Sequence, residues 1–452
     1  MELTGSFIAD IELLISIGIF LCLFLYLVVR LPVVGLVCFI FLTLTRAHEY
    51  IPNSELFRPS VIVGMIMLIG LAFHLLIMRQ PLRFTGPQSW LLVVFIAISL
   101  ILLFTKGQMI YDSNNHLLIE PLLLVAVAFF ATLNAVKSLS DLKIILNTFA
   151  VIGVTIALLT LVQSFITGIM TGQTWIYMGE QGMVNRAGSL GIDPNEVAAT
   201  LATLLPVFFF LFDNEKSSTF RRTLYLLGIP LAILTIFLTY SRGGFLCLMV
   251  ALFLIFKKRL LAKYVIGFAA LVIIIFVLVP FTFWERIAST GTTDTTGQGR
   301  MIIWEVTLNM IQEHPLTGIG FGQFPYVFAQ YSGQKYYYFS PQSTYLGIAA
   351  ETGIVNLLIY LVLCGVTFFN LHQLKRGAQI LNDTVMIKLC DVLNASLVVA
   401  MISGLTLDRR MWILVYILLA LAVVLKRIGQ QSRAPVAVAA HDVRMIPRLL
   451  NA

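Results

Sequence analysis

Charged residues are scarce in this chain of 452 residues. Asp, Glu, Lys and Arg make up only 12% of it, and hydrophobic residues make up 59%. In soluble globular domains the charged fraction is about 25%. The composition therefore excludes an ordinary soluble domain and predicts a polytopic membrane protein.

Cysteine and histidine are also few, with five and six residues. The cysteines lie within or at the ends of apolar runs, without paired spacing or neighbouring histidines, so we expect neither a disulfide framework nor a zinc site. No histidine–carboxylate spacing is typical of a metal site, and no glycine-rich nucleotide loop is followed by a lysine. The sequence predicts no metal and no cofactor.

Long apolar runs are abundant. At about 20 residues per crossing of a ~30 Å hydrocarbon core, the runs predict an all-α integral membrane protein with about 12–13 transmembrane helices. The first run has no basic segment before it, so we expect a retained span rather than a cleaved signal. The short run at 32–45 is expected to be tilted or re-entrant. The expected spans are 11–29, 32–45, 60–78, 88–104, 117–135, 143–170, 195–213, 222–240, 242–257, 261–281, 343–369, 385–405 and 411–427.

Lysine and arginine predict the orientation. They concentrate in alternate connections, and cytoplasmic loops carry the positive excess. The net charge of +8 is thus expected from membrane topology rather than from nucleic-acid binding. We expect one transmembrane domain over 1–428, with the external loop 282–343 as a lid that contains helices, and a cytoplasmic tail at 429–452. Within the loop, Gly318, Gly320 and Gly322 follow no strand; they predict a turn close to the membrane domain.

Three arginines stand out on the charge-poor outer face. Arg186 precedes Asp193 and the next span, and Arg242 lies between two spans joined by almost no loop. Arginine near the membrane interior is costly, so it normally faces a partner or an aqueous cavity. Interfacial snorkelling, or a salt bridge to Asp193, is the alternative.

The third arginine, Arg300, begins a predicted helix of the external loop. At about 100° per residue this helix has two faces. The polar face carries Glu305, Asn309, Gln312 and Glu313, and the apolar face carries Ile303, Trp304, Val306, Leu308, Met310 and Ile311. Arg300 falls in the middle of the apolar face, which predicts that the helix packs over the membrane domain with the guanidinium directed inward. A structural salt bridge is the alternative.

These arginines suggest a ligand. One guanidinium group can donate hydrogen bonds to two phosphate oxygens at once, and it stays charged at physiological pH. A diphosphate at the outer membrane surface would suit three arginines that converge from separate segments. Glu351 lies several residues inside the span that begins near Ser343, where an ionisable residue is a functional candidate. A hydrogen bond between packed helices is the alternative for Glu351.

Short motifs in the second half of the chain resemble the bacterial O-antigen ligase and polysaccharide polymerase superfamily. In chain order they are Arg186–Ser189 followed by Asp193-Pro194-Asn195, Ser241-Arg242-Gly243-Gly244, Gly299-Arg300 with Trp304, Pro315–Gly320, and Tyr345-Leu346 with Glu351-Thr352-Gly353. The resemblance implies a metal-independent glycosyltransferase that uses glycans carried on undecaprenyl diphosphate. It also implies that Arg242 and Arg300 occupy the positions of the family's diphosphate-binding arginines.

One position departs from the family pattern. Ligases of this family usually carry a histidine and an asparagine where this chain has Gln342 and Ser343, and the histidine is thought to activate the acceptor hydroxyl. Glutamine can orient a hydroxyl but cannot accept its proton at neutral pH. This favours a polymerase or another transferase, with Glu351 or the substrate itself as the proton acceptor.

We therefore expect transfer of a glycan from undecaprenyl diphosphate to a sugar hydroxyl of another glycan, in polysaccharide biosynthesis at the outer face of the bacterial cytoplasmic (inner) membrane. The catalytic candidates are Arg242, Arg300, Glu351 and Gln342, and the diphosphate-binding candidates are Arg186, Arg242 and Arg300. The expected partners are the lipid-linked oligosaccharide, the glycan acceptor, the bilayer, and a chain-length regulator or flippase, but no nucleic acid. Two alternatives stay open: ligation to lipid A core or protein, and flipping or export of a lipid-linked glycan.

Overall fold

The computed structural model describes residues 23–46, 59–79, 81–107, 118–171, 177–179, 182–184, 192–257, 295–333 and 340–431. In these residues eight helices are long and apolar enough to cross a membrane, or nine if one bent pair is a single span. Two further apolar helices are shorter. The predicted all-α polytopic class is confirmed. The predicted span at 261–281 and most of that at 11–29 lie outside the described residues.

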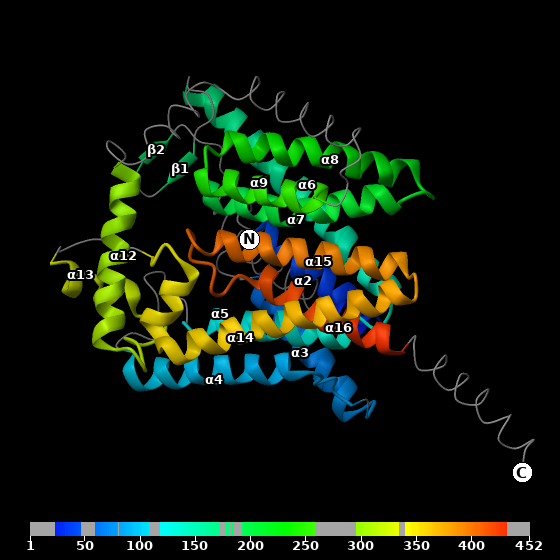
Figure 1. The fold of residues 1–452 in the computed structure, drawn as a ribbon, viewed down its shortest axis with the longest axis horizontal. Helices are drawn as coiled ribbons and strands as arrows, with labels where there is room; N and C mark the ends of the chain where they lie inside the picture. Colours follow the sequence, from blue (N-terminus) through cyan, green and yellow to red (C-terminus); the bar gives the residue numbers. More distant parts are fainter. Residues whose placement is uncertain are drawn as a thin grey trace, which may run out of the picture.

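Figure 1 shows the helices in chain order. They are α2 (Pro32–Thr45), α3 (Pro59–Leu76), α4 (Pro87–Lys106), α5 (Glu120–Ala135), α6 (Leu139–Thr171), α7 (Pro194–Asn214), α8 (Thr219–Leu238), α9 (Arg242–Phe256), α12 (Thr295–Glu313), α13 (Phe324–Ser332), α14 (Thr344–Ile380), α15 (Thr384–Ser403) and α16 (Ile413–Gln431). Two short strands, β1 (Tyr177–Gly179) and β2 (Gly182–Val184), pair antiparallel, with Tyr177 opposite Val184.

The short run at 32–45 is a bent element. It forms α2, which meets the preceding helix Leu23–Arg30 at 117°. Pro32 disfavours the helical conformation at Leu31, whose φ of -132° and ψ of 76° break the helix. The expectation that this run is not a simple straight span agrees with the bend.

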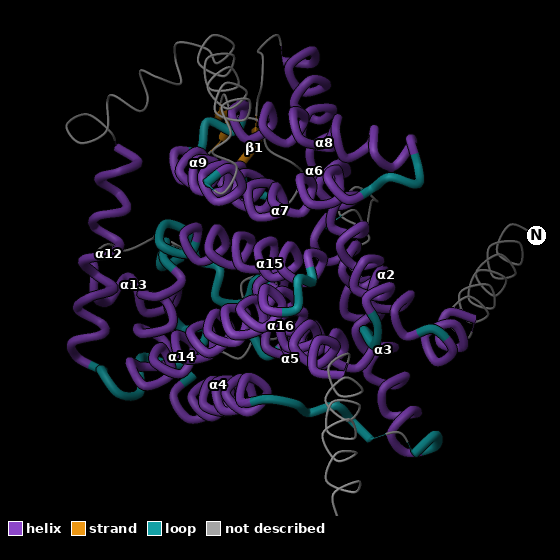
Figure 2. Tube along the Cα trace, turned by 45° about the vertical axis from the view of Figure 1, so that its right-hand side comes forward, coloured by secondary structure: helices purple, strands orange, loops and turns teal. Residues whose placement is uncertain are grey.

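The bundle is built around α16. Its residues from Ile413 to Leu425 are all buried, and a helix that is apolar on all sides belongs inside a protein. In Figures 1 and 2, α14, α15 and α5 lie beside it, while α12 crosses one end of the bundle. We call this end the cap end, and residues 295–333 the cap segment.

The two ends of the bundle differ in charge. α7, α9, α14 and α16 all begin at the cap end. Basic residues of the described connections and helix ends gather at the opposite end, which carries Lys137, Lys143, Lys216, Arg221, Arg222, Lys257, Lys375, Arg376, Lys388, Lys426 and Arg427. The alternation of basic and less basic connections expected from the sequence is therefore present in the described helices.

The cap segment has its own small core. Ile303, Val306 and Met310 of α12 pack with Phe324 and Phe328 of α13 and with Ala350 of α14. The N-terminal part of α12 extends towards the side of the bundle where α7, α8 and α9 lie (Figures 1 and 2). α12 itself packs on α13 and α14.

Candidate functional site

The packed face of α12 runs through Arg300. Ile303 is 5% exposed, and Thr307 and Met310 are fully buried, whereas Glu305 is exposed. Arg300 is half-buried and lies three residues before Ile303 and seven before Thr307, so it shares their face. Arg300 therefore lies on the packed side of α12, and the inward direction of its guanidinium stays a prediction. The assignment of Leu308 to the packed face was wrong. Leu308 is 47% exposed, because the packed face is centred on Thr307.

The glycine-rich turn after α12 docks on a break in α14. Gly353 has φ 85° and ψ 164°, so the helix is interrupted there and does not form one continuous span. The backbone carbonyls of Ala350 and Glu351 accept hydrogen bonds from the N–H groups of Ile319 (2.9 Å) and Gly320 (3.0 Å). The predicted close approach of this turn to the membrane domain is confirmed.

Close contact between two backbone segments explains why Gly318 and Gly353 are glycines. Gly318 has φ +61°, and a Cβ on it would lie 2.3 Å from the carbonyl carbon of Glu351. A Cβ on Gly353 would lie 2.1 Å from the carbonyl oxygen of Leu316. Lys106, at the end of α4, donates from Nζ to the carbonyl oxygen of Gly318 at 2.9 Å. The turn is therefore held between α4 and α14.

Glu351 fastens the same turn from inside. Its side chain is fully buried, and its carboxylate accepts hydrogen bonds from the backbone N–H groups of Gly322 (2.5 Å) and Phe324 (3.2 Å). Oε2 also lies 2.7 Å from Nη1 of Arg410, in the loop between α15 and α16. Both carboxylate oxygens are thus engaged in contacts that join the turn, α14 and this loop. Its assignment as a proton acceptor stays a prediction, and its contacts favour a structural role.

Arg410 is held between two acids. Its Nη2 lies 3.3 Å from Oδ2 of Asp408, and its Nη1 donates to the carbonyl oxygen of Gly347 at 3.3 Å. Burial raises the pKa of Asp408, and the charge of Arg410 opposes that rise. Asp408 therefore helps to position Arg410.

Arg242 is the first residue of α9, and its position depends on the helix cap. Ser241 accepts a hydrogen bond from the N–H of Gly244 at 3.0 Å, as an N-cap residue does. The Ser241 hydroxyl also donates to Oδ1 of Asn195 at 2.8 Å. A Cβ on Gly243 would lie 2.8 Å from Oγ1 of Thr406. The start of α9 is therefore fixed against α7 and the loop after α15.

Gln342 lies at the entry to α14. It adopts the left-handed conformation with φ 52°, and its carbonyl oxygen accepts a hydrogen bond from Nε1 of Trp304 at 3.4 Å. Its side-chain amide donates to Oγ of Ser340 at 3.0 Å. Trp304 thus ties α12 to the entry of α14.

A second buried arginine lies at the cap end. Arg409 is 7% exposed, and its Cζ lies 4.3 Å from the ring centre of Trp412. Its Nη1 is 3.8 Å from Oε1 of Glu196, whose other oxygen is 3.9 Å from Nη2 of Arg46. Burial lowers the pKa of Arg409, and Glu196 opposes the shift. Arg46, Glu196 and Arg409 therefore link α2, α7 and the loop after α15.

Arg409 and Arg410 were missed as site candidates by sequence reasoning. The available signal was a pair of adjacent arginines in a short connection at the charge-poor end. Arg186 lies outside the described residues. Among the described residues, no three His, Cys, Asp or Glu side chains lie close enough together to hold a metal ion.

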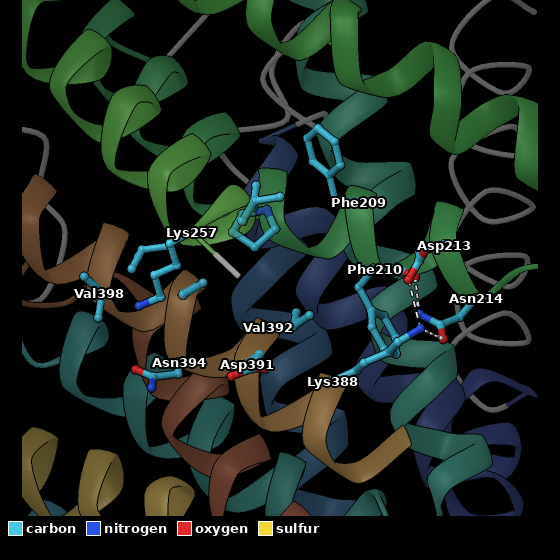
Figure 3. Close-up of a pocket in the computed structure, with 14 residues that line it drawn as sticks. Phe209, Phe210, Asp213, Asn214, Lys257, Lys388, Asp391, Val392, Asn394 and Val398 are labelled. Carbon is cyan, nitrogen blue, oxygen red and sulfur yellow. Dashed lines mark hydrogen bonds and ion pairs between the residues drawn. The ribbon is translucent and has the colours of Figure 1, made fainter. Parts of the chain in front are cut away.

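One cavity lies away from these residues. It has a volume of about 270 Å³ and lies between α7, α9 and α15 at the end opposite the cap. Figure 3 shows Lys388 reaching towards Asp213 and Asn214, at 2.8 and 3.1 Å, beside Phe210 and Val392. Its polar side chains include an exposed ion pair, and it contains none of the predicted site residues.

The fold and these contacts define a polytopic membrane protein with a helical cap segment fastened across one end of its bundle, and with arginines placed at that end. Residues 227–361 of the chain match the family model of O-antigen ligase. The match supports the O-antigen ligase and polysaccharide polymerase superfamily, and with it an enzyme of the glycosyl-transferring ligase or polymerase type. It includes Arg242, Arg300, Gln342 and Glu351 but not Arg186 or Arg410. No curated protein matches the chain significantly.

Proposed function

We propose that the protein transfers a glycan from undecaprenyl diphosphate to a sugar hydroxyl of a second glycan, without a metal ion. The reaction elongates a cell-surface polysaccharide or an exopolysaccharide. The observation that carries the proposal is the joint position of Arg242 and Arg300. One begins α9 at the cap end, and the other lies on the packed face of α12, which crosses that end.

The proposed chemistry uses the arginines as electrostatic catalysts. The bond between the anomeric carbon and the diphosphate oxygen breaks, and the acceptor oxygen forms the new glycosidic bond. Negative charge then develops on the leaving diphosphate, where Arg242 and Arg300 stabilise it. The acceptor proton passes to an oxygen of the departing diphosphate, because Glu351 is fully buried and both its oxygens already accept hydrogen bonds. Gln342 orients the acceptor hydroxyl.

The membrane orientation follows from charge. The end opposite the cap carries most of the basic residues that the structure describes, and the positive-inside rule assigns such an end to the cytoplasm. The cap segment and the arginine site then face outwards, where undecaprenyl diphosphate presents its finished glycan. A flippase would supply the substrate to this side.

Ligation to lipid A core or to protein is the second candidate, and the match to the O-antigen ligase model favours it. The same donor and the same arginines serve both reactions. Gln342 favours polymerisation, since it cannot act as the base that a histidine supplies in ligases.

The test is a reconstituted assay with a lipid-linked oligosaccharide as both donor and acceptor. We expect chain elongation by the wild type, and a loss of about 10²–10³ in rate for Arg242→Ala and for Arg300→Ala. Arg221→Ala is the matched control, because Arg221 is 47% exposed at the opposite end of the bundle. Undiminished elongation by the Arg242 and Arg300 variants would contradict the proposal. Movement of the lipid across the bilayer without new glycosidic bonds would indicate a flippase.

A further inference from the structure

Arg409 has hydrogen-bond donors that no group in the described part of the chain satisfies. Its side chain is 7% exposed, and its Nε and Nη2 atoms are buried without a hydrogen-bond partner. The third nitrogen, Nη1, faces Glu196 at 3.8 Å, which is beyond hydrogen-bond length. Buried polar groups in folded proteins are nearly always paired, so an unpaired pair of guanidinium donors requires an explanation. A ligand with suitable acceptor oxygens provides one.

The position of Arg409 connects it to the proposed site. Its backbone N–H donates to Oγ1 of Thr344, the first residue of α14, at 2.8 Å. Glu196 is in the first turn of α7, directly after Asn195, whose amide oxygen holds the cap of α9. The loop that carries Arg409 also contacts α9 directly, through Thr406 beside Gly243. Arg409 therefore lies among the starts of α7, α9 and α14, beside the helix that begins with Arg242.

The neighbouring acidic groups leave one edge of the guanidinium without a hydrogen-bond acceptor. Glu196, Asp193 and Asp408 are the acidic groups that act on Arg409, and Arg46 is the basic one. Glu196 is shared with Arg46, Asp193 accepts from the N–H of Asn195 to cap α7, and Asp408 pairs with Arg410. The Nε and Nη2 atoms form one edge of the guanidinium plane, and this edge matches two oxygens of a phosphate. Trp412, stacked on the same group, fixes the plane.

We propose that Arg409 is a further diphosphate-binding residue, which donates from Nε and Nη2 to diphosphate oxygens of the lipid carrier next to Arg242. This inference rests on the proposed function and adds to it a binding residue in the bundle itself, outside the cap segment. The diphosphate is then held from the cap side by Arg300 and from the bundle side by Arg409.

The test measures binding to the purified full chain by native mass spectrometry, with undecaprenyl diphosphate and undecaprenyl monophosphate as probes. Arg409→Lys keeps the charge but removes the two-donor edge. We expect it to weaken diphosphate binding by about tenfold and to change monophosphate binding much less. Arg427→Lys is the matched control, because Arg427 is a half-buried arginine at the opposite end that donates to the carbonyl oxygens of Leu133 and Val136. We expect it to leave both affinities unchanged.

A second variant tests the same point by a gain of affinity. Glu196→Gln removes the carboxylate that competes for Arg409, so diphosphate should bind severalfold more tightly if Arg409 receives it. Unchanged or weaker binding by Glu196→Gln would overturn the inference, and this variant decides the question if Arg409→Lys does not fold.

The outcomes separate the two proposals. A wild type that does not bind undecaprenyl diphosphate refutes the proposed function and the inference together. The role of Arg409 alone is refuted if the wild type binds undecaprenyl diphosphate and elongates glycans but Arg409→Lys binds the diphosphate equally well. It is also refuted alone if Arg409→Lys loses affinity for the diphosphate and the monophosphate to the same extent.

Discussion

Nη1 of Arg410 lies 2.7 Å from Oε2 of Glu351, and this contact joins the loop before α16 to the first part of α14. Glu351 is fully buried and the Arg410 side chain is 15% exposed, so neither charge is well solvated. Gly322 and Phe324 of the cap segment donate to the same carboxylate. One ion pair therefore controls how the cap segment is fastened to the bundle.

Replacing Glu351 with glutamine should destabilise the protein strongly. It leaves Arg410 buried without this charged partner, and breaking a buried pair costs about 3–5 kcal/mol. We expect a large fall in thermal stability in detergent, together with loss of glycan transfer as the turn is released. Lys388→Gln, which breaks the exposed Lys388–Asp213 pair, should cost at most about 1 kcal/mol. A Glu351→Gln protein as stable as Lys388→Gln would contradict this role.

The break in α14 should be sensitive to a single methyl group. Gly353→Ala places a Cβ 2.1 Å from the carbonyl oxygen of Leu316, at a backbone φ of +85°. We expect a strain of about 1–3 kcal/mol and faster proteolysis of the displaced turn. Gly365→Ala in the same helix meets nothing within 4 Å and should be neutral or stabilising by up to about 1 kcal/mol. Equal protease sensitivity of the two variants would argue against docking of the turn at the break.

The cap of α9 should affect transfer as well as stability. Ser241→Ala removes the N-cap that precedes Arg242, and Ser218→Ala removes the N-cap of α8 at the opposite end. Each should cost about 1 kcal/mol of stability. Only Ser241→Ala should reduce the transfer rate, by about tenfold, because a misplaced binding residue slows reaction. Rates that fall equally in the two variants would show that the effect is general destabilisation.

Position 342 offers a test through pH. Gln342→His introduces a group with a pKa of about 6.5, which is close to the range where transfer would be assayed. We expect the rate of the variant to fall as the pH drops below about 6.5, because a protonated imidazole cannot accept the hydrogen bond that orients the acceptor hydroxyl. Gln342→Asn keeps an uncharged amide, so its transfer rate should not fall in this pH range. If both variants have the wild-type pH profile, residue 342 does not contact the acceptor hydroxyl.

Helical periodicity predicted the face of α12 that carries Arg300, because the spacing of side chains on a helix is fixed by its geometry. It failed for Leu308, where residue type gave the wrong side, and it assigned the buried Thr307 to neither face. Thr307 is buried because its hydroxyl donates to the carbonyl oxygen of Ile303, which satisfies the polar group inside the helix. The direction from which α13 and α14 approach decides which face of α12 is packed. This direction cannot be inferred from the sequence of α12 alone.

The ion pair between Glu351 and Arg410 could not be read from spacing. Its partners lie on separate segments and meet only because α15 returns the chain to the cap end. The depth of Glu351 in its span was predictable, but its partner was not. The break at Gly353 was equally hidden, since an apolar run indicates a span without indicating that two carbonyls within it bond to another segment.

The docking of the cap segment on α14 also sets an order of assembly. The turn that contains Gly318 and Gly320 is synthesised before the carbonyl groups of Ala350 and Glu351 to which it binds, and Arg410 is made later still. During synthesis from the N-terminus, the cap segment must therefore stay undocked until α14, α15 and the following loop have been made. The last spans to leave the ribosome thus complete the cap end, so a chain cut short before Arg410 would carry its cap segment without the ion pair that fastens it.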